Sequence, residues 1–381
     1  MSVRMTLPRR LELRWRRKVP SAALPVTTRA PFVRESLSVP VALLLIVAMT
    51  LPAGMAGIWF SGVQLLAAGG SDAALAMAPW RAMLVDNAPA AAAPAVVGLS
   101  YFLPLLLTTL AAGFLWESVF AHYRNRPPDC GIFYTAWLFT LMLPAGASLV
   151  TVAIGASFAF LVGKLLFGGT GRYLVSPALL GIVFLNFAYP VTTDAVQSFP
   201  VAGGAADPVL TTALEEGAEG LADAGINLVP VALGLDIGAF GTTSAIACAF
   251  GAVLLMLGGL VSWRIIAAAL AGSLLMTLAL NAWGPDDPAF DLPWRWHLAT
   301  GSFAFLVAFV ATDPTGATVT RAGRWIYGFL IGAAAILFRV ANSSHPEGAL
   351  YAVLLVSLAA PAIDHAVIAL QLRRHRRRFR S

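Results

Sequence analysis

Long apolar runs are the feature of this sequence that most restricts how the chain can fold. Stretches of about 18 or more mainly apolar residues recur along its 381 residues. A helix needs about 20 such residues to cross the roughly 30 Å hydrocarbon core of a bilayer. The strands of a membrane barrel would instead alternate polar and apolar residues. We therefore expect an all-α polytopic protein that crosses a membrane many times.

About ten apolar runs, separated by polar residues, can be recognised. Composition agrees with this interpretation, because 59% of the residues are hydrophobic and only 12% are charged, whereas soluble domains carry about 25% charged residues. Several runs contain Gly or Pro, so their boundaries hold to within a few residues. The predicted spans lie at 39–62, 94–120, 131–146, 149–167, 174–190, 237–261, 265–283, 297–312, 325–341 and 349–371.

The basic residues give an independent test of the topology. Cytoplasmic loops of membrane proteins are enriched in Lys and Arg. With the N-terminus in the cytoplasm, the predicted inner segments, counting Lys164 at the end of its helix, hold 22 of the 25 Lys and Arg residues. The exceptions are Arg81, Arg295 and Arg339. The net charge of +6 is thus explained by topology, and we do not expect nucleic-acid binding.

The longest predicted loop supports the same orientation. Residues 191–227 contain six acidic residues and no Lys or Arg, as expected for a non-cytoplasmic loop. An even number of spans returns the basic tail to the side on which the chain began. We predict a multi-pass protein of a bacterial-type inner membrane, with both termini in the cytoplasm.

Two parts of the chain share an order of features. Residues 131–190 and 297–361 each contain an aromatic-rich span ending in Pro-x-Gly-Ala, an Ile-Gly-Ala helix, a Gly-containing turn and a last helix closed by Pro. In the predicted topology the two copies enter the membrane from opposite sides. Such inverted repeats place a site near the midplane, built from broken helices. The alternative is that Gly, Ala and Phe make any two membrane helices look alike.

This symmetry divides the chain into five parts, with about five helices in each half. They are a basic cytoplasmic segment at 1–38, a first half at 39–190, an acidic non-cytoplasmic loop at 191–236, a second half at 237–371 and a basic cytoplasmic tail at 372–381.

One short segment has the residue types of an anion site. Three glycines surround Thr170 between two basic residues, and exposed amides with two cations can hold an anionic group such as a phosphate. The simpler interpretation is a tight inner turn whose basic residues set the topology. The candidate cofactor-binding residues are Lys164, Gly168, Gly169, Thr170, Gly171, Arg172 and Ser176.

Ionisable residues within or beside the spans form a second set. Charges at membrane depth are costly and usually face the protein interior or a cavity. The candidates for an ion or proton pathway are Asp313, Arg339, Glu347, Asp364 and His365. Arg339 and Glu347 are expected to pair across the turn between them. For Asp364 and His365, the alternatives are a helix cap and a salt bridge to the basic tail.

Two long blocks carry a resemblance to a known family. The first reads GIFYTAWLFTLMLPAG and then VAIGASFAFLVGKLLFGGTGRYLVSPALLGIVFLNFAYP. The second reads FAFLVAFVATDPTGATVTRAGRWIYGFLIGAAAILFRVANSSHPEGALYAVLLVSLAAPAIDH. From about residue 29 onward, the chain resembles the B-subunit of the sodium-translocating NADH:quinone reductase and, less closely, the D-subunit of the Rnf complex.

The resemblance implies a ten-helix inverted-repeat fold like that of urea channels. It also implies membership of a multisubunit electron-transfer complex that couples redox steps to cation movement, with other membrane subunits and quinone as partners. In such proteins an FMN is attached through its phosphate to the threonine of an S/T-G-A-T sequence, located after the helix that ends here in FAYP.

The sequence departs from the family at that attachment site. Its nearest counterpart is Gly204-Ala205-Ala206, so an alanine without a hydroxyl stands in the place of the threonine. Thr211 and Thr212 lie nearby but lack the preceding Gly-Ala. We therefore do not expect covalent FMN; a flavin, as FMN or riboflavin, would be held without a covalent bond.

Two hypotheses remain open at this point. The chain is either a membrane subunit of an electron-transfer complex, or a non-redox scaffold or channel-like subunit that keeps the fold without the flavin. It contains no nucleotide-binding loop for NADH, and its two cysteines, Cys130 and Cys248, cannot supply the ligand set of an iron–sulfur cluster or a structural metal. NADH oxidation would therefore occur in another polypeptide.

Overall fold

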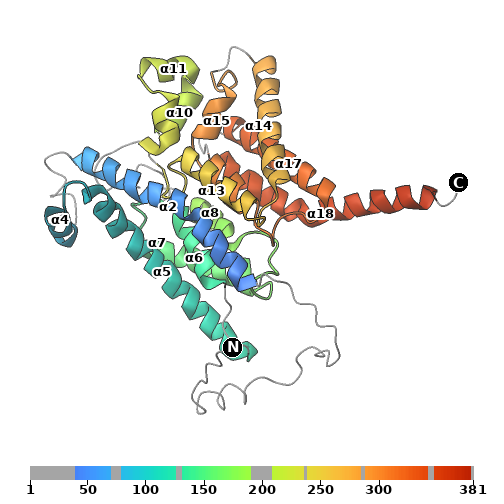
Figure 1. Cartoon of the computed structure of the whole chain (residues 1–381), viewed down its shortest axis with the longest axis horizontal. Coiled ribbons are helices and arrows are strands. Elements are labelled where there is room, and N and C mark those ends of the chain that lie inside the picture. Colours follow the sequence, from blue (N-terminus) through green and yellow to red (C-terminus); the bar gives the residue numbers. More distant parts are fainter. Residues whose placement is uncertain are drawn as a thin grey trace, which may run out of the picture.

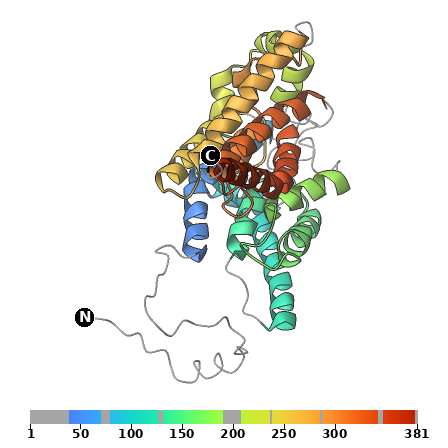
Figure 2. The ribbon, with the colours of Figure 1, turned by 90° about the vertical axis from the view of Figure 1, so that its right-hand side faces the viewer.

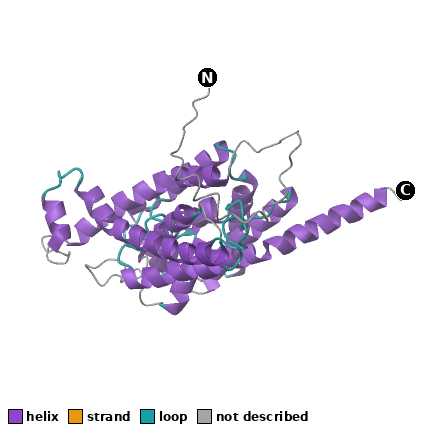
Figure 3. Cartoon of the chain, turned by 90° about the horizontal axis from the view of Figure 1, so that it is seen from below, coloured by secondary structure: helices purple, strands orange, loops and turns teal. Residues whose placement is uncertain are grey.

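The computed structural model of the chain describes most of the predicted membrane region. Within the described residues the regular structure is helical and includes no strand (Figure 3). Five of these helices are long and apolar enough to cross a membrane, and shorter apolar helices accompany them, so the chain is an all-α polytopic membrane protein. The described ranges are 39–69, 79–125, 131–189, 208–235, 238–284, 288–341 and 347–378.

The long helices pack in two groups. Helices α2 and α5 lie side by side (Figure 1), and α17 packs against both α14 and α18. Small residues let the backbones approach closely. At Gly332 of α17, for example, an added Cβ atom would lie only 1.9 Å from the carbonyl oxygen of Ala269 in α14. The bounds are α2 (Val39–Gly69), α5 (Ala93–Arg124), α14 (Trp263–Trp283), α17 (Arg321–Ala341) and α18 (Gly348–Arg378).

Two of the shorter elements reach only part of the way through a bilayer. Helix α6 has ten residues, about 15 Å, which is half of a hydrocarbon core. The continuous helix formed by α16 and η5 is shorter still; we call α6 and α16–η5 the half-helices. The bounds are α6 (Ile132–Leu141), α7 (Leu149–Phe158), η2 (Ala159–Leu165), α8 (Pro177–Ala188), α13 (Ala245–Leu257), α16 (Phe303–Phe305) and η5 (Leu306–Val310).

Each predicted span contains a helix, but two spans are broken. In the run at 237–261, the helix begins only at α13. Its start is capped by Ser244, whose hydroxyl accepts a hydrogen bond from the amide of Ala247 at 3.2 Å. The residues before it, 238–244, are non-helical and rich in glycine and hydroxyl side chains. The run at 297–312 is divided by a turn at 300–302 between α15 (Trp294–Ala299) and α16.

The contacts between helices follow the same order in the two halves. In the first half, α5 packs against α7, and α7 and η2 pack against α8. In the second half, α14 packs against α17, and α17 packs against α18. The inverted repeat itself and the division of the chain into five parts stay predictions.

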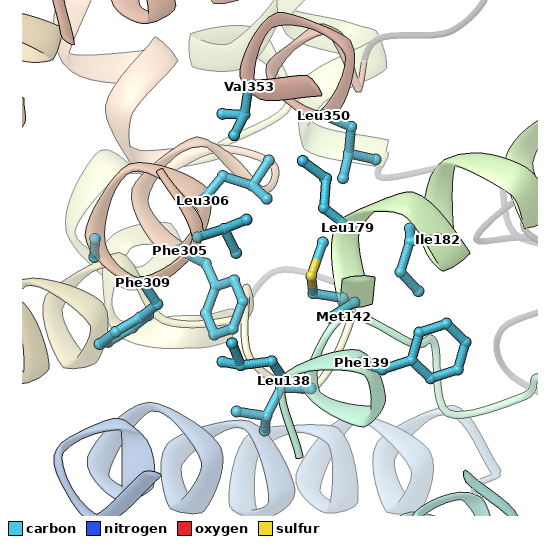
Figure 4. Close-up of a cluster of buried hydrophobic side chains, with 14 of the residues drawn as sticks. Leu138, Phe139, Met142, Leu179, Ile182, Phe305, Leu306, Phe309, Leu350 and Val353 are labelled. Atoms are coloured by element: carbon cyan, nitrogen blue, oxygen red, sulfur yellow. The ribbon is translucent and has the colours of Figure 1, made fainter. Parts of the chain in front are cut away.

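The half-helices meet at the centre of the molecule. Figure 4 shows Leu138 of α6 next to Phe305 of α16–η5, and Met142, which follows α6, next to Leu179 of α8. Side chains of α18 complete the packing. We call this group the central cluster, and its members are almost fully buried. It consists of Leu138, Phe139, Met142, Leu179, Ile182, Phe305, Leu306, Phe309, Leu350 and Val353.

Short helices cover one end of the bundle (Figures 1 and 2). Val209 and Leu221 of this cover pack against two residues near the start of the α15 segment: Leu292, just before the helix, and Trp296, within it. We call this the cap end, and the opposite end, where η2 leads into α8, the loop end. The remaining bounds are α4 (Pro79–Asp86), α10 (Pro208–Glu215), α11 (Gly217–Asp223), α12 (Leu228–Pro230) and η4 (Val231–Leu235).

Candidate functional site

The turn before α16–η5 is held by two charged residues. Gly301 takes a φ of +67°, a left-handed conformation that favours glycine. The buried Arg339 donates hydrogen bonds to the carbonyl oxygens of His297 at 2.9 Å and Thr300 at 3.2 Å. On the same turn, the hydroxyl of Ser302 donates to the carboxylate of Glu347. Arg339 and Glu347 therefore fix the cap end of this half-helix.

These bonds correct one expectation from the sequence. Arg339 and Glu347 were predicted to pair with each other, but each instead bonds to the turn at 300–302. The reason is the interrupted helix, whose carbonyls need donors at membrane depth. The guanidinium of Arg339 supplies two of these donors.

Asp313 ends the same half-helix at the loop end. Its side chain is 2% exposed. One carboxylate oxygen accepts hydrogen bonds from the amide of Thr315 at 3.0 Å and from its hydroxyl at 2.8 Å. The other accepts from the hydroxyl of Tyr173 at 3.2 Å. A buried carboxylate is thus held by neutral groups at the point where a helix breaks.

The segment that carries Tyr173 touches both half-helices. We call residues 166–176, between η2 and α8, the glycine loop. A Cβ atom on Gly131, at the start of α6, would lie 2.3 Å from the Thr170 hydroxyl, so the loop packs against the loop end of α6. Its other contact is the bond from Tyr173 to Asp313. The glycine loop therefore joins the loop ends of α6 and α16–η5.

Some amides of the glycine loop that a phosphate cradle would use are bonded within the protein. Gly168, Gly169 and Gly171 do take positive φ values, as such a cradle needs. However, the amides of Gly168 and Gly169 donate to carbonyl oxygens at the end of η2, and the amide of Arg172 donates to the carbonyl oxygen of Gly169. Of the cations, Arg172 is exposed and Lys164 is fully buried. Cofactor binding by these residues stays a prediction, and Ser176 lies buried at the start of α8.

Lys164 forms a buried ion pair with Glu117 of α5. The two side chains are 0% and 4% exposed, and Nζ lies 2.6 Å from Oε1. Lys164 belongs to η2, a π-helical turn of a kind often found at functional sites. The neighbouring Arg124 of α5 donates to the carbonyl oxygen of Leu165 at 2.7 Å. Helix α5 is thus bound to the end of η2, immediately before the glycine loop.

Sequence reasoning missed Glu117. The signal was present, because Glu117 is an acidic residue inside the apolar run at 94–120. A charge within a span needs a partner at the same depth. The sequence alone does not show which basic residue reaches it.

Asp364 of α18 caps α17. Its carboxylate accepts hydrogen bonds from the amides of Val319 at 2.8 Å and Thr320 at 3.1 Å, and from the Thr320 hydroxyl at 2.5 Å. These groups immediately precede the first turn of α17, where amides lack helical partners. Among the alternatives named above, the helix cap is the arrangement found. His365 is exposed, and the pathway role of both residues stays a prediction.

The structure describes only part of the segment that was compared with the flavin-attachment site. Gly204-Ala205-Ala206 lies outside the described residues. Thr211 and Thr212 belong to α10 in the cover of the cap end. Leu210 also belongs to α10, and a Cβ atom on Gly301 would lie 3.3 Å from its side chain. Helix α10 therefore contacts the turn that Arg339 holds.

Comparison with known proteins decides the family. The model of the NQR2, RnfD, RnfE family matches residues 26–372, which include both half-helices and the glycine loop. The chain belongs to this family. It is 38% identical over 360 residues to the B-subunit of the Na⁺-translocating NADH-quinone reductase of Azotobacter vinelandii, covering 92% of this chain and 89% of that protein.

Other relatives in the NQR2, RnfD, RnfE family carry the same name. The protein of Pseudomonas aeruginosa is 38% identical over 360 residues, again 92% of this chain and 89% of the relative. That of Chromohalobacter salexigens is 36% identical over 361 residues, 93% of this chain and 87% of the relative.

The buried ion pair gives a stability prediction. Glu117→Gln removes the carboxylate and leaves the Lys164 ammonium buried beside a neutral side chain, which is expected to destabilise the protein by about 3–5 kcal/mol. The double variant Glu117→Leu with Lys164→Met removes both charges and is expected to recover most of that loss. The measurement is the thermal unfolding midpoint of the full chain in detergent. Glu215→Gln, at an exposed position, is the control; a stable single variant would contradict the assignment.

The cap on α17 gives a second prediction. Asp364→Ala removes three hydrogen bonds at the helix start and should lower stability by about 1–2 kcal/mol. His365→Ala changes the exposed neighbouring residue and should have little effect. Hydrogen exchange at residues 319–324 is the direct measurement, because the loss should be concentrated there. Equal protection in the two variants would argue against the cap.

Proposed function

We propose that this chain is a membrane subunit of a multisubunit electron-transfer complex related to the Na⁺-translocating NADH-quinone reductase. Similarity over 92% of the chain to proteins of that name supports the proposal. The observation that carries it is the pair of half-helices fixed at their ends by residues of the family-matched region. In this proposal the protein lies in the inner membrane, with both termini and the loop end on the cytoplasmic side.

The proposed role includes cation movement past Asp313. Breaks between half-helices at membrane depth are typical cation positions, because carbonyl oxygens and carboxylates gather there. Of the five pathway candidates, Asp313 is the carboxylate that lies buried among neutral hydrogen-bond donors. Arg339, Glu347 and Asp364 bond to turns and a helix end, which suits a positioning role. His365 is the exposed member of the set.

The central cluster lies along the half-helix between Asp313 and the turn at 300–302. Phe305 and Phe309 are four residues apart on α16–η5 and both are almost fully buried. A hydrophobic constriction of this kind blocks the passage of hydrated ions. We propose that cation transfer requires this packing to open, and that opening is tied to electron transfer within the complex.

Any flavin carried by this chain is proposed to be FMN or riboflavin held without a covalent bond. The support is the alanine at position 206, which offers no hydroxyl for a phosphoester. A flavin would supply the one- or two-electron chemistry, and the complex would provide NADH oxidation and quinone reduction through other polypeptides. Other membrane subunits and quinone are the proposed partners.

The second candidate is a non-redox scaffold or channel-like subunit. The central cluster speaks against a permanently open channel, because the buried Phe305 lies between the two half-helices, next to Leu138 (Figure 4). A scaffold is consistent with the same packing. The two candidates differ in whether flavin and redox partners accompany the chain.

Purification of the full chain from its native membrane in mild detergent tests the proposal. We expect other membrane subunits to co-purify by mass spectrometry, and flavin absorbance that is released by acid precipitation. Flavin fluorescence that stays with the chain on a denaturing gel would contradict non-covalent binding, and Thr211→Val with Thr212→Val would locate the attachment. A folded chain with neither flavin nor redox partners would support the scaffold.

Cation coupling gives a separate prediction for the assembled complex. Asp313→Asn keeps the size of the side chain but removes its charge. The Na⁺ concentration that half-maximally stimulates quinone reduction should then rise roughly tenfold or more. Asp364→Asn, at the helix cap, is the matched control and should leave the Na⁺ dependence in place. An unchanged dependence in Asp313→Asn would remove this residue from the pathway.

A further inference from the structure

Helix α18 is longer than a bilayer requires. It runs without a break for 31 residues, about 46 Å, whereas about 20 residues cross a hydrocarbon core. Its last turns project away from the other described helices (Figures 1 and 3). Leu370 and Leu372 near this end are 55% and 53% exposed. The helix therefore carries an apolar surface outward until residue 372.

Basic residues follow at once. Residues 373–378, which we call the arginine segment, read Arg-Arg-His-Arg-Arg-Arg. Beyond Asp364 the sequence contains no acidic residue, so none stands four positions away along the helix from any member of the segment. The change from exposed leucine to arginine is abrupt. In a helix that leaves a membrane, such a change marks the level of the lipid headgroups.

The helical backbone spreads these positions around its axis. Successive residues are rotated by about 100°, so six positions cover more than one full turn. A protein partner would contact one side of such a helix. A layer of headgroups surrounds an emerging helix on all sides. The distribution of charge therefore fits lipid phosphates better than an acidic protein surface.

We propose that the arginine segment is a binding site for the phosphate groups of anionic phospholipids in the leaflet at the loop end. The planar guanidinium bonds phosphate oxygens in pairs. Clusters of four to eight basic residues directly beyond a span attract anionic lipid. Binding here holds the end of α18 whose Asp364 caps α17. The proposal uses the orientation proposed above and is independent of flavin or cation transfer.

The test places a probe next to the segment in the full chain. Leu372→Cys carries a bimane fluorophore in a background with Cys130→Ala and Cys248→Ala. The protein is reconstituted in phosphatidylcholine vesicles that contain a minor fraction of spin-labelled phosphatidylglycerol or spin-labelled phosphatidylcholine. We expect phosphatidylglycerol to quench the probe several-fold more than phosphatidylcholine, and this preference to weaken as salt screens the charges.

Matched variants identify the residues responsible. Changing the five arginines at positions 373, 374, 376, 377 and 378 to glutamine should abolish the preference, whereas changing them to lysine should keep part of it. Changing Arg9, Arg10, Arg14, Arg16 and Arg17 to glutamine removes the same charge from the other terminus and should leave the preference intact. An impermeant quencher reports whether the probe stays on one side of the membrane in each variant.

Three results would overturn the proposal. The first is equal quenching by the two lipids in the wild-type background, and the second is a preference that survives the glutamine changes at 373–378. The third is a preference that disappears when the chain is assembled with its partner subunits, which would assign the segment to an acidic protein surface. Flavin content and quinone reduction are measured on the same samples, so that a failure of the proposed function is seen separately.

Discussion

Backbone polar groups at membrane depth must find hydrogen-bond partners inside the protein, and this constraint organises the structure. Water is not available there, so a helix that stops halfway exposes amides and carbonyls at a cost of several kcal/mol each. The described part of the chain contains the two half-helices, to which this applies. The carbonyls of Leu141 and Leu143, at the end of α6, accept from the amides of Gly241 at 2.6 Å and Phe240 at 3.3 Å. Around α16–η5, Arg339 bonds the preceding turn and Asp313 the following one.

This constraint also explains where charge occurs inside the protein. Arg339 was an exception to the positive-inside pattern, and it lies where a broken helix needs donors. Arg81, a second exception, lies over the ring of Tyr101, with its guanidinium carbon 3.9 Å from the ring centre. The Glu117–Lys164 pair joins α5 to the π-helical turn before the glycine loop. Each of these charges has a neighbour that accounts for its position.

The all-α polytopic fold could be predicted from the sequence, because the length of each apolar run and the charges beside it can be evaluated span by span. The breaks within spans were harder to predict. An apolar run locates a span but does not show where the helix within it begins. The non-helical residues 238–244 bond to the end of α6, which lies far away in sequence. The glycine loop shows the same limit. Its glycines indicate a tight turn and do take positive φ values. Only the fold shows that two of its amides bond carbonyl oxygens at the end of η2 and that Lys164 faces Glu117.

The shared glycine loop gives the two half-helices a physical connection. Thr170 packs on Gly131 at the start of α6, and three residues later Tyr173 bonds Asp313 at the end of α16–η5. Because three glycines lie between η2 and Tyr173, the loop can change course with little steric resistance. A displacement of the loop would act on both half-helices, and their common surface is the central cluster (Figure 4). Packed interfaces of this kind change between discrete arrangements, so one event at the loop end is sufficient in principle to open or close the centre.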